Sequence, residues 1–177
     1  FPDFCLCSLH GFFYLIFCSI SNQIDSCPFS DSRRSITGNK LVLTPTTINK
    51  DHFCDINSNF EVSFGCDPGS SSQVTKIPDN LFYHCQISLI TFSKYIKSIG
   101  TGSFYACTID EIKFPEDSQL TTISNYAFFS VYFLKPLKLP ETIEFVGDSA
   151  FQSSGIQNID FKQIIIIGKS AFQECNK

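Results

Sequence analysis

Apolar positions recur at fixed offsets through the second half of the chain. Five anchor phenylalanines lie 22, 24, 23 and 21 residues apart, at Phe82, Phe104, Phe128, Phe151 and Phe172. The residues eight and five positions before each anchor are all aliphatic. The nearer of these two columns consists of Ile77, Ile99, Ile123, Val146 and Ile167. Because the same offsets return in every copy, the pattern predicts five structural repeats of 21–24 residues.

A second apolar motif follows each of the first four anchors, as "ISLITF", "IDEIKF", "LKPLKL" and "IQNIDF". We place a one-residue insertion in the third copy, so that its inward positions start at Leu134. Short apolar runs of this kind, bounded by turn residues, indicate strands with one buried face. The outward positions form a candidate binding surface: Ser88, Leu89, Thr91, Asp110, Glu111, Lys113, Lys135, Lys138, Gln157, Asn158 and Asp160.

Such a repeat predicts a solenoid, because one copy cannot cover its own apolar face and neighbouring copies must stack. The pattern I-x-x-I-x-F-P, followed by L-x-x-I-x-x-x-A-F-x-x-C, resembles the BspA-type leucine-rich repeat of surface proteins in host-associated bacteria and protists. We therefore expect a mainly β, right-handed leucine-rich-repeat solenoid of 5–6 coils with an irregular N-terminal cap. Its core is predicted to contain Ile77, Phe82, Ile99, Phe104, Ile123, Phe128, Val146, Phe151, Ile167 and Phe172.

The rest of the chain divides into three further segments. Residues 48–73 contain a degenerate repeat and a loop, and residues 22–47 do not fit the columns and are expected to form the cap. The array at 74–177 stops where its next strand would begin, which predicts truncation at the C-terminus. Residues 1–21 resemble a signal peptide, because an apolar run of nine at 12–20 ends among the small residues Ser19 and Ser21. An N-terminal membrane anchor over 4–20 is the alternative.

The cysteines have spacings that do not suit a zinc site, because no C-x-x-C pair occurs. Cys27, Cys54 and Cys66 are the disulfide candidates, expected to close the cap in an oxidising compartment. Cys85 and Cys107 occupy equivalent places in adjacent repeats, so they are either a disulfide or, as we favour, two buried thiols.

Several short motifs imitate ligand sites without completing them. Gly168-Lys169-Ser170 copies the end of a Walker A loop, but Gln163 stands where the first glycine is required, and Gly168 is explained by a turn after an inward isoleucine. Residues 55–59 copy the start of an EF-hand loop, but Phe60 replaces its glycine and Cys66 its final glutamate. We therefore predict no nucleotide, no cofactor and no metal.

The composition narrows the class of function. Thirteen Lys and Arg against seventeen Asp and Glu, with no basic run longer than two residues, give no footprint for nucleic acid. His10, His52 and His84 are scattered, so no catalytic pairing is indicated and no enzyme is expected. The interpretation is a secreted or cell-surface protein that binds a protein or other macromolecular ligand, similar to BspA-type adhesins. The alternative is an intracellular scaffold or regulatory module of the same fold.

Overall fold

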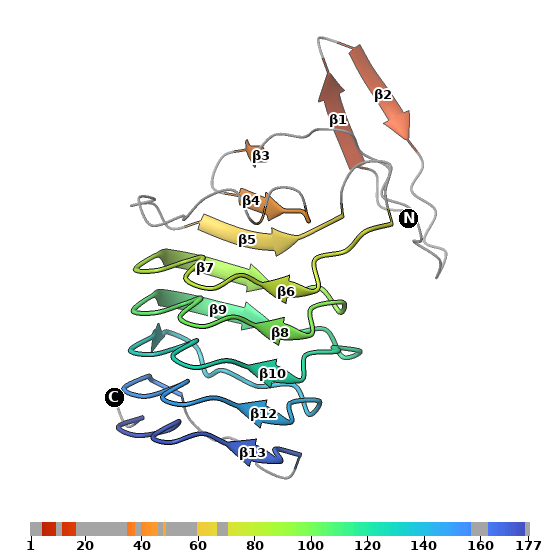
Figure 1. Cartoon of the computed structure of the whole chain (residues 1–177). Coiled ribbons are helices and arrows are strands. Elements are labelled where there is room, and N and C mark those ends of the chain that lie inside the picture. The colour runs from red at the N-terminus through yellow and green to blue at the C-terminus, as the bar shows by residue number, and fades with distance from the viewer. Residues whose placement is uncertain are drawn as a thin grey trace.

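The protein is a β-solenoid in which each coil lies directly beneath the one before it (Figure 1). The structure is a computed structural model that describes residues 40–45, 48, 60–66, 71–156 and 163–175, and the backbone alone of 5–9, 12–16 and 35–37. No helix occurs among these residues. The repeat pattern therefore predicted the architecture correctly, and the all-strand, stacked arrangement is confirmed.

Two sheets run along the solenoid. The face sheet has the order β11-β9-β7-β5-β4-β3, and the short-strand sheet has the order β13-β12-β10-β8-β6. The face sheet consists of β3 (Ser35–Thr37), β4 (Lys40–Leu43), β5 (Phe60–Phe64), β7 (Gln86–Thr91), β9 (Thr108–Lys113) and β11 (Tyr132–Phe133). The short-strand sheet consists of β6 (Lys76–Ile77), β8 (Ser98–Ile99), β10 (Thr122–Ile123), β12 (Phe145–Val146) and β13 (Ile166–Ile167). All neighbours in both sheets are parallel except β3 and β4.

The third side of each coil, here called the turn side, is built around the anchor phenylalanine. Its N–H donates to a carbonyl of the next coil, as do the N–H groups two residues before and after it. In the first of these coils the bonds run from Asn80 to Thr101, from Phe82 to Ser103 and from His84 to Tyr105, at 2.8–2.9 Å. The same three bonds recur between each later pair of coils. The turn side therefore carries its own hydrogen-bonded ladder without forming strands.

This ladder depends on residues in the left-handed conformation, two in every coil. They occupy the positions two before and two after the anchor and have φ between 52° and 61°: Asn80, His84, Gly102, Ala106, Tyr126, Ser130, Ser149, Ser153, Ser170 and Glu174. Only one of them is glycine, although a side chain makes this conformation costly. Tertiary hydrogen bonding between coils therefore overrides local preference at nine positions.

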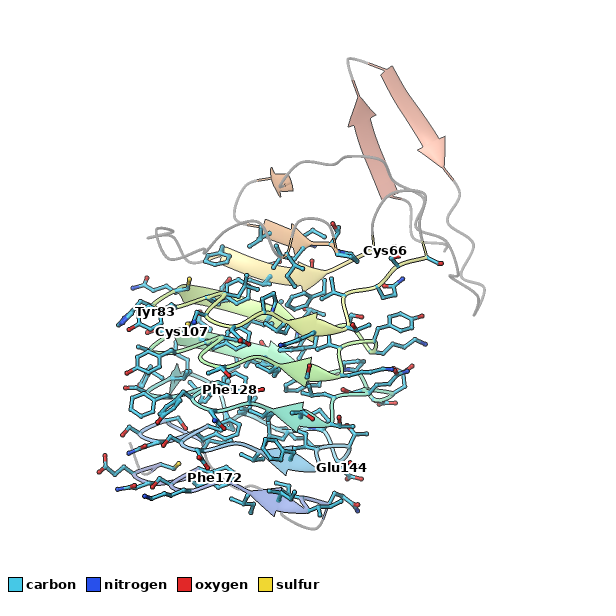
Figure 2. The ribbon with its side chains drawn as sticks, viewed as in Figure 1. Cys66, Tyr83, Cys107, Phe128, Glu144 and Phe172 are labelled. Atoms are coloured by element: carbon cyan, nitrogen blue, oxygen red, sulfur yellow. The ribbon has the colours of Figure 1, made fainter. Side chains whose placement is uncertain are left out.

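The anchor phenylalanines stack into a continuous column inside the solenoid, and two of them, Phe128 and Phe172, are labelled in Figure 2. Consecutive ring centroids are 5.2, 5.0, 5.1 and 5.4 Å apart, with interplanar angles of no more than 14°. Eight of the ten predicted core residues are fully buried, the exceptions being the two in the last coil. Ile167 is 47% exposed and Phe172 is half-buried. Ile167 lies on the edge strand β13, and no other described strand covers it.

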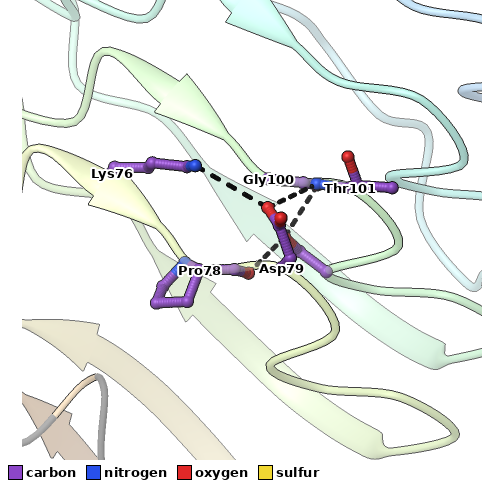
Figure 3. A network of polar contacts seen from close by, with 6 residues as sticks. Lys76, Pro78, Asp79, Gly100 and Thr101 are labelled. Carbon is purple, nitrogen blue, oxygen red and sulfur yellow. Dashed lines mark hydrogen bonds and ion pairs between the residues drawn. The ribbon is translucent and has the colours of Figure 1, made fainter.

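Glycine recurs four residues before the anchor because of the coil above it. A Cβ on Gly100 would overlap Asp79 Oδ1, and one on Gly147 would overlap the side-chain oxygen of Asn125. These oxygens accept backbone N–H groups of the next coil; Asp79 Oδ1, for example, lies 3.0 Å from the nitrogen of Thr101 (Figure 3).

The same arrangement corrects the explanation of Gly168 as a turn residue. Its φ is not positive, and a Cβ there would collide with the backbone and carboxylate of Asp148. The exception supports the rule: Ser124 occupies the glycine position of its coil, and the residue above it is Thr101, which has a shorter side chain than Asp or Asn. The close approach of the preceding coil therefore favours glycine four residues before the anchor.

The third copy of the second apolar motif differs from its prediction. Phe133, not Leu134, is the inward residue, because Phe133 pairs with Ile109 and is buried while Leu134 is 56% exposed. The insertion thus follows Phe133. The strand stops there, and Pro136, two residues beyond the exposed Leu134, has no N–H to continue the ladder.

The N-terminal part joins the solenoid earlier than the columns indicated. β4 lies in the segment predicted as cap, yet it pairs in parallel with β5, and β3 then closes the edge in antiparallel fashion. Residues 5–16 contain the antiparallel pair β1 (Cys5–Leu9) and β2 (Phe12–Ile16). Among the residues described, none forms a helix with the length and apolarity that a membrane span requires. The signal peptide stays a prediction.

Candidate interaction surface

The outward side of the face sheet, here called the strand face, brings most of the predicted binding residues together. Leu89 of β7 lies opposite Glu111 of β9, and Thr91 lies opposite Lys113. Lys135 and Lys138 are exposed on the segment after β11. Gln157, Asn158 and Asp160 lie outside the described residues. The face is therefore a continuous surface over at least β7, β9 and the segment after β11.

A bulge shapes this surface at β7. Phe60 pairs with Ile87, but the next residue, Glu61, pairs with Leu89, so that Ser88 is the extra residue. A bulge of this kind lets consecutive residues turn toward the same side. Ile87 and Ile90 are fully buried, while Ser88 and Leu89 between them remain partly accessible. The strand therefore presents two adjacent side chains to a partner instead of one.

The charged residues of the strand face form one cluster. Glu111 Oε2 lies 2.5 Å from Lys135 Nζ, and its Oε1 lies 3.7 Å from Lys113 Nζ. The hydrogen bond from Lys135, with the positive charge of Lys113, lowers the pKa of the Glu111 carboxyl. The acidic and basic stretches that the sequence presents separately are thus parts of one cluster with two lysines around one glutamate.

Sequence reasoning missed the contribution of the N-terminal strands to this face. Lys40 of β4 pairs with Glu61 of β5, which in turn pairs with Leu89, and Ser63 pairs with Thr91. Lys40 and Glu61 are exposed, whereas the residues that alternate with them are buried. The period-two pattern of "KLVL" and "FEVSF" carried this signal, but it was obscured because these segments lack the anchor columns of the later repeats.

The cysteines occupy two different environments. Cys66 is disulfide-bonded, whereas Cys85, Cys107 and Cys175 are not in disulfides. Cys85 and Cys107 are buried thiols in adjacent coils, and burial raises the pKa of Cys107. The Cys107 thiol donates to the Phe82 carbonyl of the preceding coil, so it is a satisfied core side chain. Cys27 and Cys54 lie outside the described residues.

The Walker-like stretch has the wrong electrostatics for a phosphate. The backbone N–H of Lys169 donates to Asp148 Oδ1 at 2.7 Å, so a carboxylate already occupies the place where this amide would contact an anion. The described part of the chain also contains no cluster of three His, Cys, Asp or Glu side chains that could hold a metal ion.

Comparison with known proteins agrees with this geometry. The family model described as "BspA type Leucine rich repeat region" matches residues 46–177 with six copies. No curated protein and no solved structure matches the chain significantly. The matched region spans the described face-sheet strands from β5 onward and the whole short-strand sheet.

Proposed function

The chain belongs to the BspA-type leucine-rich repeat family, and on that premise we propose that it is a non-enzymatic adhesion protein, secreted or at the cell surface, whose strand face binds a partner protein. Leucine-rich repeat domains generally mediate protein interactions, so the chain is a repeat interaction module. The observation that carries the proposal is the continuous strand face with its Lys135–Glu111–Lys113 cluster.

The chemistry of the face suits a folded protein partner. Glu111 and its two lysines offer charges of both signs, and such complementarity contributes specificity and a faster encounter. Beside them, Leu134 is 56% exposed on the segment that carries Lys135. An apolar side chain next to a polar cluster is the usual composition of an interface core with its polar rim.

The disulfide at Cys66 favours the extracellular form of the proposal. Disulfides persist in oxidising compartments and are rare in the cytosol. The alternative, an intracellular scaffold or regulatory module, rests on the three cysteines that are not in disulfides, since a reducing compartment would preserve their thiols. Two of these thiols are buried and inert to solvent, so they are compatible with either compartment.

The location is tested by the intact mass of the chain expressed in a eukaryotic host with its own N-terminus, with and without alkylation under denaturing conditions. Recovery from the medium, loss of about 21 residues and an unalkylated Cys66 are expected. An uncleaved chain that stays in the cell, with Cys66 alkylated, would support the intracellular alternative instead.

The binding surface is tested by charge reversal against a panel of purified extracellular-matrix and cell-surface proteins. Glu111→Lys leaves three lysines without a carboxylate, and we expect at least a tenfold loss of affinity for a bound protein, or about 1.4 kcal/mol. Glu144→Lys makes the same charge change beside β12, away from the face sheet (Figure 2), and serves as the matched control. Equal losses in both variants would refute the assignment of the strand face.

A further inference from the structure

A second exposed surface lies on the turn side, where the residue after each anchor forms its own aromatic column. Tyr83 stacks on Tyr105 and Tyr105 on Phe129, with ring centroids 4.9 Å apart at both steps and interplanar angles of 13° and 11°. His84 packs edge-on against Tyr83 at 4.4 Å, and Tyr126 packs against Phe129 at 5.8 Å. We call these five side chains the aromatic edge.

The aromatic edge is accessible and its polar atoms are unused. Tyr83 is 38% and Tyr126 44% exposed, and Tyr83 stands at the outer margin of the coils (Figure 2). In the described part of the chain, the hydroxyls of Tyr83, Tyr105 and Tyr126 and the ring nitrogens of His84 have no hydrogen-bond partner. Aromatic side chains combine a large apolar surface with polar groups at their tips, so this edge offers both kinds of contact to one ligand.

The segments that form this edge carry no formal charge, in contrast to the strand face. Residues 80–86, 102–109, 124–133 and 149–156 contain no Asp, Glu, Lys or Arg, and the first charged residue beside the column is Glu174 in the last described coil. A charged ligand held here would lose hydration without gaining a counter-charge, which is unfavourable. Around its five aromatic side chains the edge therefore favours an uncharged ligand over a charged one.

The edge is also narrow and repetitive. It places one column of rings along the solenoid axis, whereas a folded protein partner needs on the order of 800 Å² on each side of a stable interface. In the next two coils the column continues with Gln152 and Gln173, whose amides add neutral donors and acceptors. A row of similar subsites at one spacing suits a ligand that is itself a chain of similar units.

We propose that the aromatic edge binds an uncharged oligosaccharide lying along the solenoid axis. Sugar rings present C–H surfaces that pack on aromatic side chains, and hydroxyls that pair with Tyr, His and Gln groups. The Tyr83–Tyr105–Phe129 column supplies the apolar contacts, and the free phenol and imidazole groups supply the hydrogen bonds. This site is separate from the strand face and does not depend on the function proposed for it.

The test is direct binding of the full chain to an immobilised panel of uncharged oligomers of glucose, mannose, galactose and N-acetylglucosamine, with sulfated and sialylated glycans for comparison. We expect at least one uncharged oligomer to bind. Tyr105→Ala should weaken that binding about tenfold, since it removes a stacking surface and a hydrogen bond worth roughly 1–2 kcal/mol together. Tyr105→Phe keeps the stack and should weaken binding only about threefold, the share of one hydrogen bond.

Two further variants keep the test decisive. Tyr83→Ser removes the outermost ring of the column with little effect on the core, so it covers the case in which Tyr105→Ala fails to fold. Glu111→Lys on the strand face should leave glycan binding unchanged. The proposal is overturned if no uncharged oligomer binds at millimolar concentration, if only charged glycans bind, if the tyrosine variants bind like the wild type, or if the edge captures a glycan-free protein instead.

Discussion

The interior coils and the last described coil share one sequence pattern but not one environment. Val146 and Ile167 are register partners on the neighbouring strands β12 and β13, yet Val146 is fully buried and Ile167 is 47% exposed. Phe151 and Phe172 stack on each other, and only Phe151 is fully buried. The repeat pattern thus determines where a side chain stands in its coil, while the next coil determines how far it is buried. Equivalent positions should therefore differ in energy along the array.

The largest loss of stability is expected when an anchor phenylalanine is truncated, and its size should depend on the coil. Phe128→Ala should destabilise the protein by about 3–5 kcal/mol, because it leaves a cavity between two stacked rings. Phe172→Ala has a described ring on one side only and should cost less than half as much. Urea unfolding followed by far-UV circular dichroism gives both values. Equal losses would mean that burial by the following coil does not govern the contribution of an anchor.

The second test concerns contacts that span two coils. Gly147→Ala should cost roughly 2 kcal/mol, because its Cβ would overlap the side chain and backbone nitrogen of Asn125. Adding Asn125→Thr copies the Thr101–Ser124 pair of the coils above and should recover part of the loss. The backbone overlap limits this recovery.

The control for this double-mutant cycle is Ser124→Ala, expected to change the free energy of unfolding by less than about 0.5 kcal/mol. If the two substitutions at 125 and 147 were simply additive, the glycine would not be selected by the coil above it.

The sequence predicted the apolar columns, the strand positions of β7 and β9, and the burial of four anchor phenylalanines and four aliphatic residues. Its failures have physical causes. Leu134 and Phe133 are both apolar, so periodicity alone does not locate the insertion between them. The role of Gly168 depends on a side chain 20 residues earlier, Asp148, which no local pattern reveals. The left-handed residues, such as His84 and Ala106, also escape prediction, because local preference argues against them.

The candidate surface was predicted only in part for the same reason. Glu111, Lys113 and Lys135 were each placed on the outward side, but their ion pairs join residues from different coils. Which residues of neighbouring coils meet depends on the strand register. The predicted register between the third copy and the copy before it was wrong by one residue. The N-terminal Lys40 and Glu61 were missed because their strands lack an anchor phenylalanine.

The third test replaces Ser154, a buried polar residue three positions after the anchor Phe151. Ser154 is fully buried, and its hydroxyl has no hydrogen-bond partner among the described residues; the neighbouring Cys175 thiol donates instead to the Phe151 carbonyl at 3.2 Å. Val131 fills the equivalent position one coil earlier. Ser154→Val should therefore stabilise the protein by about 1 kcal/mol, since an unsatisfied buried hydroxyl costs about 1–3 kcal/mol and the larger side chain adds some strain. A loss of stability in the same urea experiment would indicate that the hydroxyl is satisfied.

The smallest expected change in stability comes from replacing left-handed residues with glycine, and it should not depend on the coil in which the residue lies. Ala106 in an interior coil and Ser170 in the last coil both have φ near 55°, at 53° and 56°. Glycine adopts this conformation without strain but loses more freedom on folding, so Ala106→Gly and Ser170→Gly should each stabilise the protein by about 0.5 kcal/mol. Because the strain resides in one residue's own backbone, the two gains should agree even though anchor truncations in an interior coil and in the last described coil differ more than twofold. A much larger gain at Ala106 would show that the interior coils hold their turns under a tertiary strain that the last coil has released.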